Sequence, residues 1–230
     1  MIISKCSADC QYLFFSATYT DACLKFCQSL APSAFTINIK KSNVMIKQIF
    51  QVRMKVEMGK KLQVLKDCYT NLETESSIVF LDTRAEAEAV SKMLIDDGYP
   101  VSTLHGDIKG DMRDAIMEQF RNQETKFLVT TNVLARGVDV PSVSVVVNYN
   151  VPRKQGGVVD DESYVHRIGR TGRFANKGIA ITLLENEEDE RALESIENEF
   201  NPAERTTVPC DSSKKSILAL KQQLRDFKKT

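Results

Sequence analysis

Residues 77–104 read SIVFLDTRAEAEAVSKMLIDDGYPVSTL, and this stretch indicates the fold. The near-continuous apolar run at 77–81 is typical of a parallel strand that is covered on both faces. From Arg84 to Asp97 the apolar positions lie on one helical stripe, and Gly98 suits a left-handed C-terminal cap. Residues 101–104 predict the next strand. A strand, a helix and a strand in this order are typical of an α/β fold.

The same alternation continues along the chain to residue 200. We predict helices at 111–121, 162–170 and 190–200, and strands at 126–130, 143–150 and 178–184. Right-handed crossovers turn this order into a parallel sheet with helices on both faces. A further amphipathic helix, roughly Lys215–Phe227, is expected to dock on the sheet domain.

Residues 1–40 follow a different pattern and are expected to be the end of another unit. QYLFFS (11–16) and AFTINI (34–39) are predicted as strands, with a helix near 20–30 between them. This segment is too short for a domain, and the polar, aperiodic residues that follow predict a linker. The predicted division is therefore a remnant at 1–40, a linker at 41–48 and a sheet domain at 49–230.

Composition excludes several classes of protein. The chain has 230 residues, of which 42% are hydrophobic and 27% charged, as in a globular protein and not a disordered one. Because 31 Lys and Arg balance 31 Asp and Glu, any site for a polyanion has to be a local patch. No apolar run approaches the roughly 20 residues of a membrane-spanning helix. The N-terminus lacks the pattern of a secretory signal, so we expect an intracellular protein with reduced cysteines.

Two C-x3-C pairs, Cys6 with Cys10 and Cys23 with Cys27, raise the question of a metal site. Zinc ribbons usually use tighter C-x2-C knuckles on turns, whereas Cys23 and Cys27 lie in a predicted helix. We therefore expect no metal, and small buried thiols in its place.

Polar residues follow the predicted strands, at the edge where ligands bind in an open parallel sheet. They are Asp82, Thr83 and Arg84 after the first strand, His105, Gly106 and Asp107 after the second, and Thr131 and Asn132 after the third. Hydroxyls and glycine amides suit phosphate oxygens. Turn chemistry explains any single one of these residues equally well. Their coincidence at one edge predicts a phosphate-binding rim.

HRIGRTGR (166–173) places Arg167, Arg170 and Arg173 at every third position, within roughly a 120° arc of a helix or tight turn. No acidic residue lies from there to Glu185, so the guanidiniums repel one another without local neutralisation. An anion such as a phosphate would resolve that repulsion, and the two glycines of the motif allow its close approach. The alternative is a solvated basic helix face.

TTNVLARGVD (130–139) supplies a second group of polar residues. Gly137 is suited to the positive φ of a chain reversal, and Asp139 would then present a carboxylate that suits a pair of ribose hydroxyls. The alternative is that Asp139 pairs with Arg136 or Arg170.

Two motifs of nucleotide-hydrolysing enzymes are missing from the sequence. Gly59-Lys60 is followed by Lys61 and not by Ser or Thr, so it is not a phosphate-binding loop, and no DEAD-like acidic tetrapeptide occurs. The arginines therefore lack a phosphate cradle and a magnesium carboxylate, and form half of an ATPase site.

These motifs together resemble those of the DEAD-box RNA helicases in order and spacing. The resemblance is carried by Ser16-Ala17-Thr18, VFLDTR (79–84), LHGD (104–107) with Arg113, TTNVLARGVD and HRIGRTGR. It covers nearly the whole chain from about Gln11, and it implies the end of a first RecA-like domain followed by a complete second one. A long insertion between Pro152 and His166 resembles the nuclear-pore mRNA-export branch of the family.

The resemblance implies that ATP and single-stranded RNA are clamped between two RecA-like domains, and it assigns roles to individual residues. The implied roles are arginine fingers for Arg170 and Arg173, nucleotide or ribose contacts for Gly137 and Asp139, RNA contacts for Thr83, Arg84, Gly106, Arg113 and Thr131, and interdomain coupling for Ser16, Ala17, Thr18 and His166. Gly110 stands where many members carry Gln, and Asp82 places a negative charge beside the implied RNA path.

The implied function is the C-terminal part of an RNA-stimulated ATPase that remodels RNA or RNA–protein complexes, in mRNA export at the nuclear pore, in the cytoplasm or the nucleus. ATP with Mg²⁺ would be held mainly by the missing first domain, so we expect no ATP hydrolysis by this chain alone. The expected partners are single-stranded RNA, that first domain and a nuclear-pore activator, for a monomer that does not bind membranes.

Two other hypotheses stay open. In the first, the chain is a truncated, non-catalytic module that binds RNA or a helicase partner. A DNA-unwinding enzyme of another helicase group is disfavoured, because HRIGRTGR ends in the DEAD-box pattern.

Overall fold

The computed structural model describes residues 7, 10–16, 19, 21–37, 48–72, 76–132, 143–172, 176–200 and 207–229. The chain divides into two compact units, Met1–Lys40 and Lys41–Thr230.

In the first unit, the described residues form the helix α1 (Asp21–Leu30) and no strand. The prediction of strands is therefore wrong for 11–16 and for the described part of 34–39. A strand needs a neighbouring strand to bind its backbone groups, and no such neighbour is described in this unit. Leu13 and Phe15 are 67% and 89% exposed, and α1 buries no residue. The described part of this unit therefore has no apolar core of its own.

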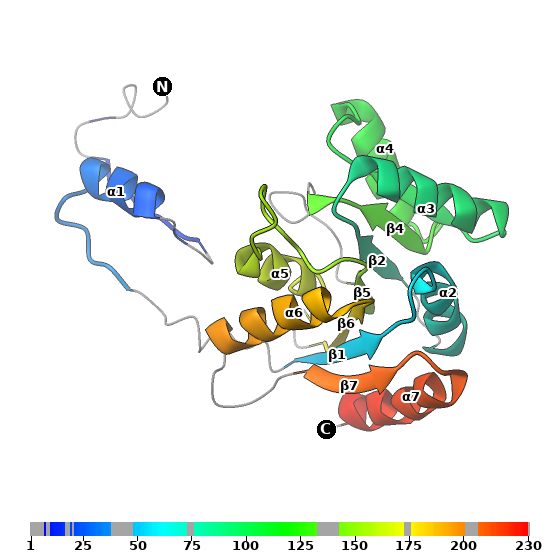
Figure 1. The fold of residues 1–230 in the computed structure, drawn as a ribbon. Coiled ribbons are helices and arrows are strands. Elements are labelled where there is room, and N and C mark those ends of the chain that lie inside the picture. Colours follow the sequence, from blue (N-terminus) through cyan, green and yellow to red (C-terminus); the bar gives the residue numbers. More distant parts are fainter. Residues whose placement is uncertain are drawn as a thin grey trace. The chain divides into compact units, whose positions relative to one another are not determined.

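In the second unit, the described strands form one parallel sheet in the order β3-β4-β2-β5-β6-β1-β7 (Figure 1). The strands are β1 (Ile49–Lys55), β2 (Ser77–Phe80), β3 (Val101–Leu104), β4 (Phe127–Thr130), β5 (Val145–Asn148), β6 (Gly178–Leu184) and β7 (Thr207–Asp211). The predicted parallel α/β sheet is confirmed.

Helices cover both faces of this sheet. They are α2 (Lys61–Leu72), α3 (Arg84–Asp96), α4 (Gly110–Arg121), α5 (Asp161–Ile168), α6 (Glu187–Phe200) and α7 (Lys214–Lys229). Successive side chains of a strand point to opposite faces, and in β2 Val79 packs with α2, α3 and α7 while Ile78 and Phe80 pack with α4. The helices α5 and α6 share a third cluster, with Ile49 and Ala180. The predicted helices on both faces are confirmed, including the terminal helix.

Capping residues set the ends of the helices α3 and α5. The Thr83 hydroxyl accepts a hydrogen bond from the Glu86 amide at the start of α3, and Gly98 follows its end with a φ of +82°. Asp160 caps α5, since its carboxylate accepts hydrogen bonds from the amide and the hydroxyl of Ser163. The predicted left-handed cap at Gly98 is confirmed, whereas the sequence did not indicate the cap at Asp160.

The sequence pattern missed β1, α2 and β7, although β1 lies inside the sheet between β6 and β7. Phe50, Val52 and Met54 alternate with Gln51, Arg53 and Lys55, so β1 lacks the continuous apolar run that is typical of a strand covered on both faces. Gln51 and Arg53 are polar and yet only 7% and 3% exposed. Both have buried partners: Gln51 accepts a hydrogen bond from the Tyr164 hydroxyl at 3.2 Å, and Arg53 forms an ion pair with Glu197. A buried polar residue with a partner on another element looks like a surface residue in the sequence.

Arg53 also ties the edge strand β7 to the sheet. Its Nε donates to Thr207 Oγ1 at 2.7 Å, and Glu197 in turn accepts hydrogen bonds from the Thr207 amide and hydroxyl. Burial of this guanidinium is tolerated because the ion pair and the hydrogen bonds satisfy it. Figure 1 shows the helix α7 alongside β7.

In the ranges that the structure describes, no helix has the length and apolar character needed to cross a membrane.

Gly178 generates a first testable prediction, because a Cβ built there would overlap Thr171 Oγ1 and the Gly172 amide nitrogen. We expect Gly178→Ala to lower the free energy of unfolding by about 1–3 kcal/mol, as overpacking does. Gly110→Ala is the matched control, because its Cβ meets open space, and it should be neutral or stabilise by less than about 1 kcal/mol. Chemical denaturation of both variants is the measurement, and equal effects would contradict the packing argument.

Tyr164 generates a second prediction, about alkaline pH. Its burial raises the pKa of the phenol from an ordinary value of 10 to about 12. The folded chain therefore favours the neutral phenol, and this contribution is complete below pH ~10 and is lost as the pH rises from ~10 to ~12. We expect Tyr164→Phe to be less stable than the parent by about 1 kcal/mol near pH 8, because it loses the hydrogen bond to Gln51.

The two proteins should reach equal stability near pH ~10.7, where the parent has lost its advantage of about 1 kcal/mol, and the parent should be the less stable one at pH ~11, where the loss is about one pKa unit, or 1.4 kcal/mol. Denaturation curves between pH 8 and pH 11.5 are the measurement, in steps of about half a unit. A stability difference that does not change with pH would show that Tyr164 does not titrate in this way.

Candidate nucleic-acid interface

The loops that leave four neighbouring strands begin at the same edge of the sheet. The register pairs Thr130 with both Leu104 and Phe80, and Phe80 with Asn148, so β3, β4, β2 and β5 end level with one another. We call the residues that follow these strands the rim: Asp82, Thr83, Arg84, His105, Gly106, Asp107, Thr131, Asn132 and Asn150. The sequence predicted that the polar residues after the first three of these strands would share one edge, and the register confirms it.

Arg84 is the exposed cation of the rim, and carboxylates on two segments hold it. Its guanidinium forms ion pairs with Asp107, after β3, and with Glu88, one turn along α3, where Nε lies 3.4 Å from Oε1. The same Glu88 oxygen lies 3.2 Å from His105 Nε2. Arg84, Glu88 and Asp107 are all more than half exposed. Any anion that binds Arg84 therefore has to compete with two carboxylates.

The other predicted RNA contacts lie on the same loops. Thr83 and Gly106 are exposed and Thr131 is half-buried. Arg113 lies in the first turn of α4, and among the described residues its buried Nε has no hydrogen-bond partner. The structure thus brings the predicted residues of the rim to one edge, with Arg113 on the helix that follows β3.

Arg167 occupies the interior behind the rim. It is 0% exposed, and its guanidinium donates to Asn132 Oδ1 at 2.8 Å and to the Asn150 carbonyl at 2.9 Å, and forms an ion pair with Asp82 at 3.0 Å. It also stacks on the Phe80 ring, 5.3 Å from the centroid. Burial lowers the pKa of this guanidinium, and the charge of Asp82 opposes that shift.

The prediction of a cluster of three arginines without a neutralising acid is therefore wrong for Arg167. Its counterion, Asp82, lies far away in the sequence and comes from the end of β2, where a search for a nearby acid does not find it. The negative charge of Asp82 also has a partner, so it does not stand unpaired beside the rim.

Arg170 follows α5 in a turn and is half-buried, and its Nε donates to the carbonyl of His166 at 3.3 Å. Ser16, in the first unit, is exposed. The remaining predicted site residues lie outside the described residues; they are Ala17, Thr18, Gly137, Asp139 and Arg173, together with Arg136, the alternative partner of Asp139.

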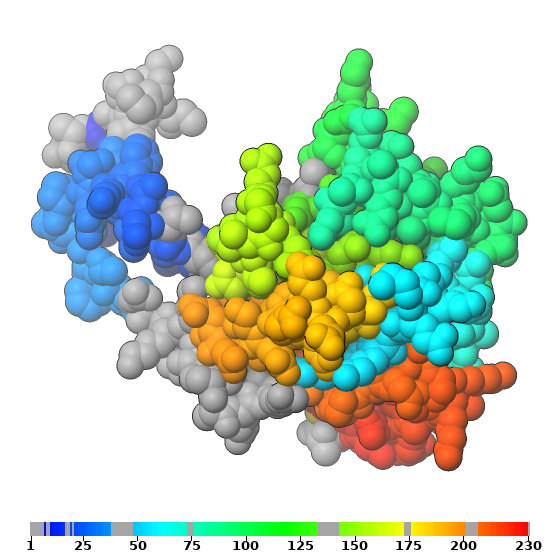
Figure 2. Space-filling view, viewed as in Figure 1, coloured from blue at the N-terminus to red at the C-terminus, as the bar shows by residue number. Residues whose placement is uncertain are grey.

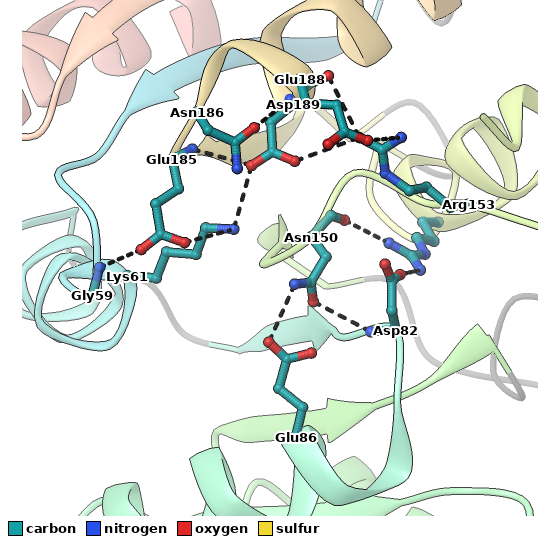
Figure 3. A network of polar contacts seen from close by, with 11 residues as sticks. Gly59, Lys61, Asp82, Glu86, Asn150, Arg153, Glu185, Asn186, Glu188 and Asp189 are labelled. Carbon is teal, nitrogen blue, oxygen red and sulfur yellow. Dashed lines mark hydrogen bonds and ion pairs between the residues drawn. The ribbon is translucent and has the colours of Figure 1, made fainter. Parts of the chain in front are cut away.

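Asn150 was not singled out in the sequence, yet it links two parts of the rim (Figure 3). Its Oδ1 accepts a hydrogen bond from the Asp82 amide, and its Nδ2 donates to Glu86, both at 3.2 Å. The side chain therefore connects the end of β5 with the start of α3. An Asn in a loop after a strand is too common a turn residue to have been picked out.

A second part of the same network lies beside α6 (Figure 3). Lys61, only 7% exposed, lies 3.7 Å from both Glu185 and Asp189, and Arg153 lies 3.0 Å from Glu188. Arg153 begins the inserted segment, which turns back through Gly156 and Gly157, both at positive φ, so that Arg153 pairs with Val159. The loop between β5 and α5 projects from the surface in the space-filling view (Figure 2).

The described cysteines are free thiols. Cys68 is buried, and burial raises the pKa of its thiol to about 12. Cys10 and Cys23 are exposed, so the prediction of buried thiols is wrong for them, because the part of the first unit that the structure describes has no core. Among the described residues, no group of three or more His, Cys, Asp or Glu side chains is arranged to hold a metal ion.

The sequence of this chain is similar to those of known helicases. Residues 60–175 match the model of the helicase conserved C-terminal domain. The ATP-dependent RNA helicase DBP5 of Kluyveromyces lactis is 38% identical over 217 residues, which cover 94% of this chain and 46% of that protein. The chain thus spans about half the length of the curated relatives it matches.

Solved structures of a yeast relative have the same fold. Saccharomyces cerevisiae Dbp5 bound to RNA and ADP BeF3 superimposes with a TM-score of 0.87 at 35% identity, over 98% of this chain and 57% of that one. A variant of the same protein bound to Nup159, Gle1, IP6 and ADP matches with a TM-score of 0.74 at 34% identity, over 98% of this chain and 58% of that one.

The sheet of the second unit is therefore a RecA-like fold. The chain belongs to the DEAD-box RNA helicases, and it carries the conserved C-terminal helicase domain of that family.

Proposed function

We propose that this chain is the C-terminal part of an ATP-dependent RNA helicase that remodels RNA or RNA–protein complexes. Its rim supplies one half of an RNA path, and the turn after α5 supplies one half of a nucleotide site. The observation that carries this proposal is the shared edge on which the loops with Thr83, Arg84, Gly106 and Thr131 lie. The match to Dbp5 bound to RNA and ADP BeF3 supports it.

The chemistry of the rim suits an RNA backbone. A guanidinium at Arg84, hydroxyls at Thr83 and Thr131, and the exposed backbone at Gly106 are groups that bind phosphate oxygens and 2′-hydroxyls. Arg113 adds a guanidinium whose buried Nε has no hydrogen-bond partner in the described part of the chain. In this proposal the groups contact the RNA backbone and not the base edges, so the binding is independent of RNA sequence and prefers RNA to DNA.

On the nucleotide side, we assign Arg170 and Arg173 as arginine fingers and Gly137 and Asp139 as nucleotide contacts. The residues present fit a contribution to a nucleotide site but not a complete one, because the sequence has no phosphate-binding loop and the described residues hold no group for a metal. A complete site supplies the charge neutralisation that ATP with Mg²⁺ requires for phosphoryl transfer. In this proposal that site lies mainly on a first RecA-like domain.

Residues 1–40 would be the end of that first domain, followed by a linker at 41–48. Exposed apolar side chains in this unit, such as Leu13, Phe15 and Phe35, fit a segment whose core partner lies elsewhere. Ser16, Ala17 and Thr18 on this side, and His166 on the other, would couple the two domains.

The proposed cellular role is mRNA export at the nuclear pore, with a nuclear-pore activator as partner and a monomeric helicase acting on the cytoplasmic or nuclear side. The support is the likeness to a Dbp5 structure that contains Nup159 and Gle1. The inserted loop between β5 and α5 fits the same branch of the family.

RNA binding by the chain is the first test, with a fluorescent oligouridine and fluorescence anisotropy as the measurement. Arg84→Ala should weaken binding. Asp107→Asn should strengthen it by about 1.4- to fivefold, because an exposed ion pair contributes about 0.2–1 kcal/mol that a phosphate no longer has to overcome. The same oligonucleotide as DNA should bind more weakly.

A double-mutant cycle separates this effect from the general loss of a negative charge. In the Arg84→Ala background, Asp107→Asn should gain no more than Asp111→Asn, a change of a neighbouring carboxylate in the first turn of α4. If Asp107→Asn and Asp111→Asn have equal effects in the parent chain, Asp107 does not restrain Arg84. If Arg84→Ala leaves RNA affinity unchanged, the proposed RNA site is wrong.

ATP hydrolysis is the second test. The chain alone should release no phosphate from Mg-ATP, with or without RNA. A chimera with an intact first RecA-like domain should show RNA-stimulated release, and Arg170→Ala should lower its kcat by about 10³-fold or more while the domain stays folded. Release by the chain alone would contradict the half-site. An inactive chimera that still binds RNA would favour the non-catalytic module.

A further inference from the structure

The Arg167 guanidinium uses each of its three nitrogens on a different loop of the rim. Nε donates to Asn132, after β4; Nη1 donates to the carbonyl of Asn150, after β5; and Nη2 pairs with Asp82, after β2. A fourth segment, the helix α5, carries the arginine itself. One buried side chain therefore connects four segments that are distant in the sequence.

Two of these partners lie next to proposed RNA-contact residues in the sequence. Asp82 precedes Thr83 and Arg84, and Asn132 follows Thr131. The Asn150 side chain adds a second layer, because it accepts a hydrogen bond from the Asp82 amide as well. The loops after β2 and β4 are thus held relative to each other through groups that do not themselves need to touch RNA.

The guanidinium is suited to this task because its donors lie in a rigid planar fork. With the side chain 0% exposed, water cannot replace a lost partner, so a loop that moved away would leave a buried charge or amide unpaired. The spacing of the loops is therefore tied to the size of the fork. A lysine keeps the charge but is a single point donor and cannot reach three loops at once.

We propose that Arg167 is a positioning residue for RNA binding: it sets the relative placement of Thr83, Arg84 and Thr131 without touching the RNA. The proposal rests on the RNA site proposed above and goes beyond it. It also separates Arg167 from Arg170, which lies one turn further on and is assigned to the nucleotide.

Arg53 provides a matched control within the same chain. It is also a buried guanidinium, at 3% exposed, with Nε on a threonine hydroxyl and an ion pair to a carboxylate. Its partners, Thr207 and Glu197, belong to β7 and α6 and not to the rim. A purely structural role predicts that Arg53→Lys and Arg167→Lys have the same consequences.

The test compares Arg167→Lys and Arg53→Lys in the full 230-residue chain, by thermal unfolding and by anisotropy with the fluorescent oligouridine, below both unfolding transitions. Both variants should lower Tm. Only Arg167→Lys should weaken RNA binding, by about tenfold, which corresponds to about 1.4 kcal/mol. It should also reduce the preference for RNA over DNA of the same length, because contacts to 2′-hydroxyls depend on placement.

The salt dependence gives an independent readout. Lysine keeps the positive charge, so the slope of log affinity against log salt should be the same in Arg167→Lys as in the parent. Arg167→Gln removes the charge and completes this readout: its slope should also stay close to that of the parent, whereas a slope flatter by about one unit would mean that Arg167 itself neutralises a phosphate and would overturn the positioning role. Should Arg167→Lys fail to fold, Asn132→Ala removes one arm of the fork and should weaken RNA binding by a smaller factor than tenfold while Arg53→Lys leaves it unchanged.

Two further outcomes separate this inference from the proposed function. If Arg84→Ala weakens RNA binding but Arg167→Lys and Arg53→Lys affect it equally, the RNA site stands and the positioning role is wrong. If the parent chain binds no RNA, or Arg84→Ala changes nothing, the proposed RNA site is wrong and the positioning role fails with it.

Discussion

The rest of this structure depends on one constraint: the strands of the described sheet all run in the same direction. Parallel strands place all of their carboxyl ends at one edge, so loops separated by tens of residues become neighbours there. The polar residues of the rim gather for this reason and not because of any direct attraction between them. The same constraint buries the strands on both faces, which leaves the edge as the place where polar chemistry can collect.

Loops that are brought together in this way still need to be held, and two buried guanidiniums hold them at different places in the sheet. Arg53 secures β7 through Glu197 and Thr207, and Arg167 secures the loops after β2, β4 and β5. A buried charge is costly unless every partner is in place, so each arginine makes the surrounding segments depend on one another. Arg84, in contrast, is exposed, and ion pairs at such a position contribute little to stability.

Periodicity was sufficient to predict most helices and strands of the sheet unit, because their apolar residues face a core that the same elements build. A continuous apolar run is missing at β1, where the apolar residues alternate with Gln51 and Arg53, whose partners are the buried Tyr164 and Glu197, and at β7, a short edge strand that contains Pro209. The prediction from apolar residues also failed at 11–16, where a strand was expected but no described strand pairs with this segment.

For the site, motif spacing predicted which loops meet, whereas the partners of Arg167 could not be predicted from sequence proximity. Asp82, Asn132 and Asn150 are brought to it only by the fold.

The proline in β7 has a consequence for how molecules of this protein meet at high concentration. In the described sheet, β7 is an outermost strand, and an outermost strand offers free backbone groups to a strand from another molecule. Pro209 has no backbone N–H to offer, so a ladder of hydrogen bonds begun there by a neighbour would be interrupted at its middle. The sheet is thereby protected at this edge against growing, strand by strand, into an aggregate.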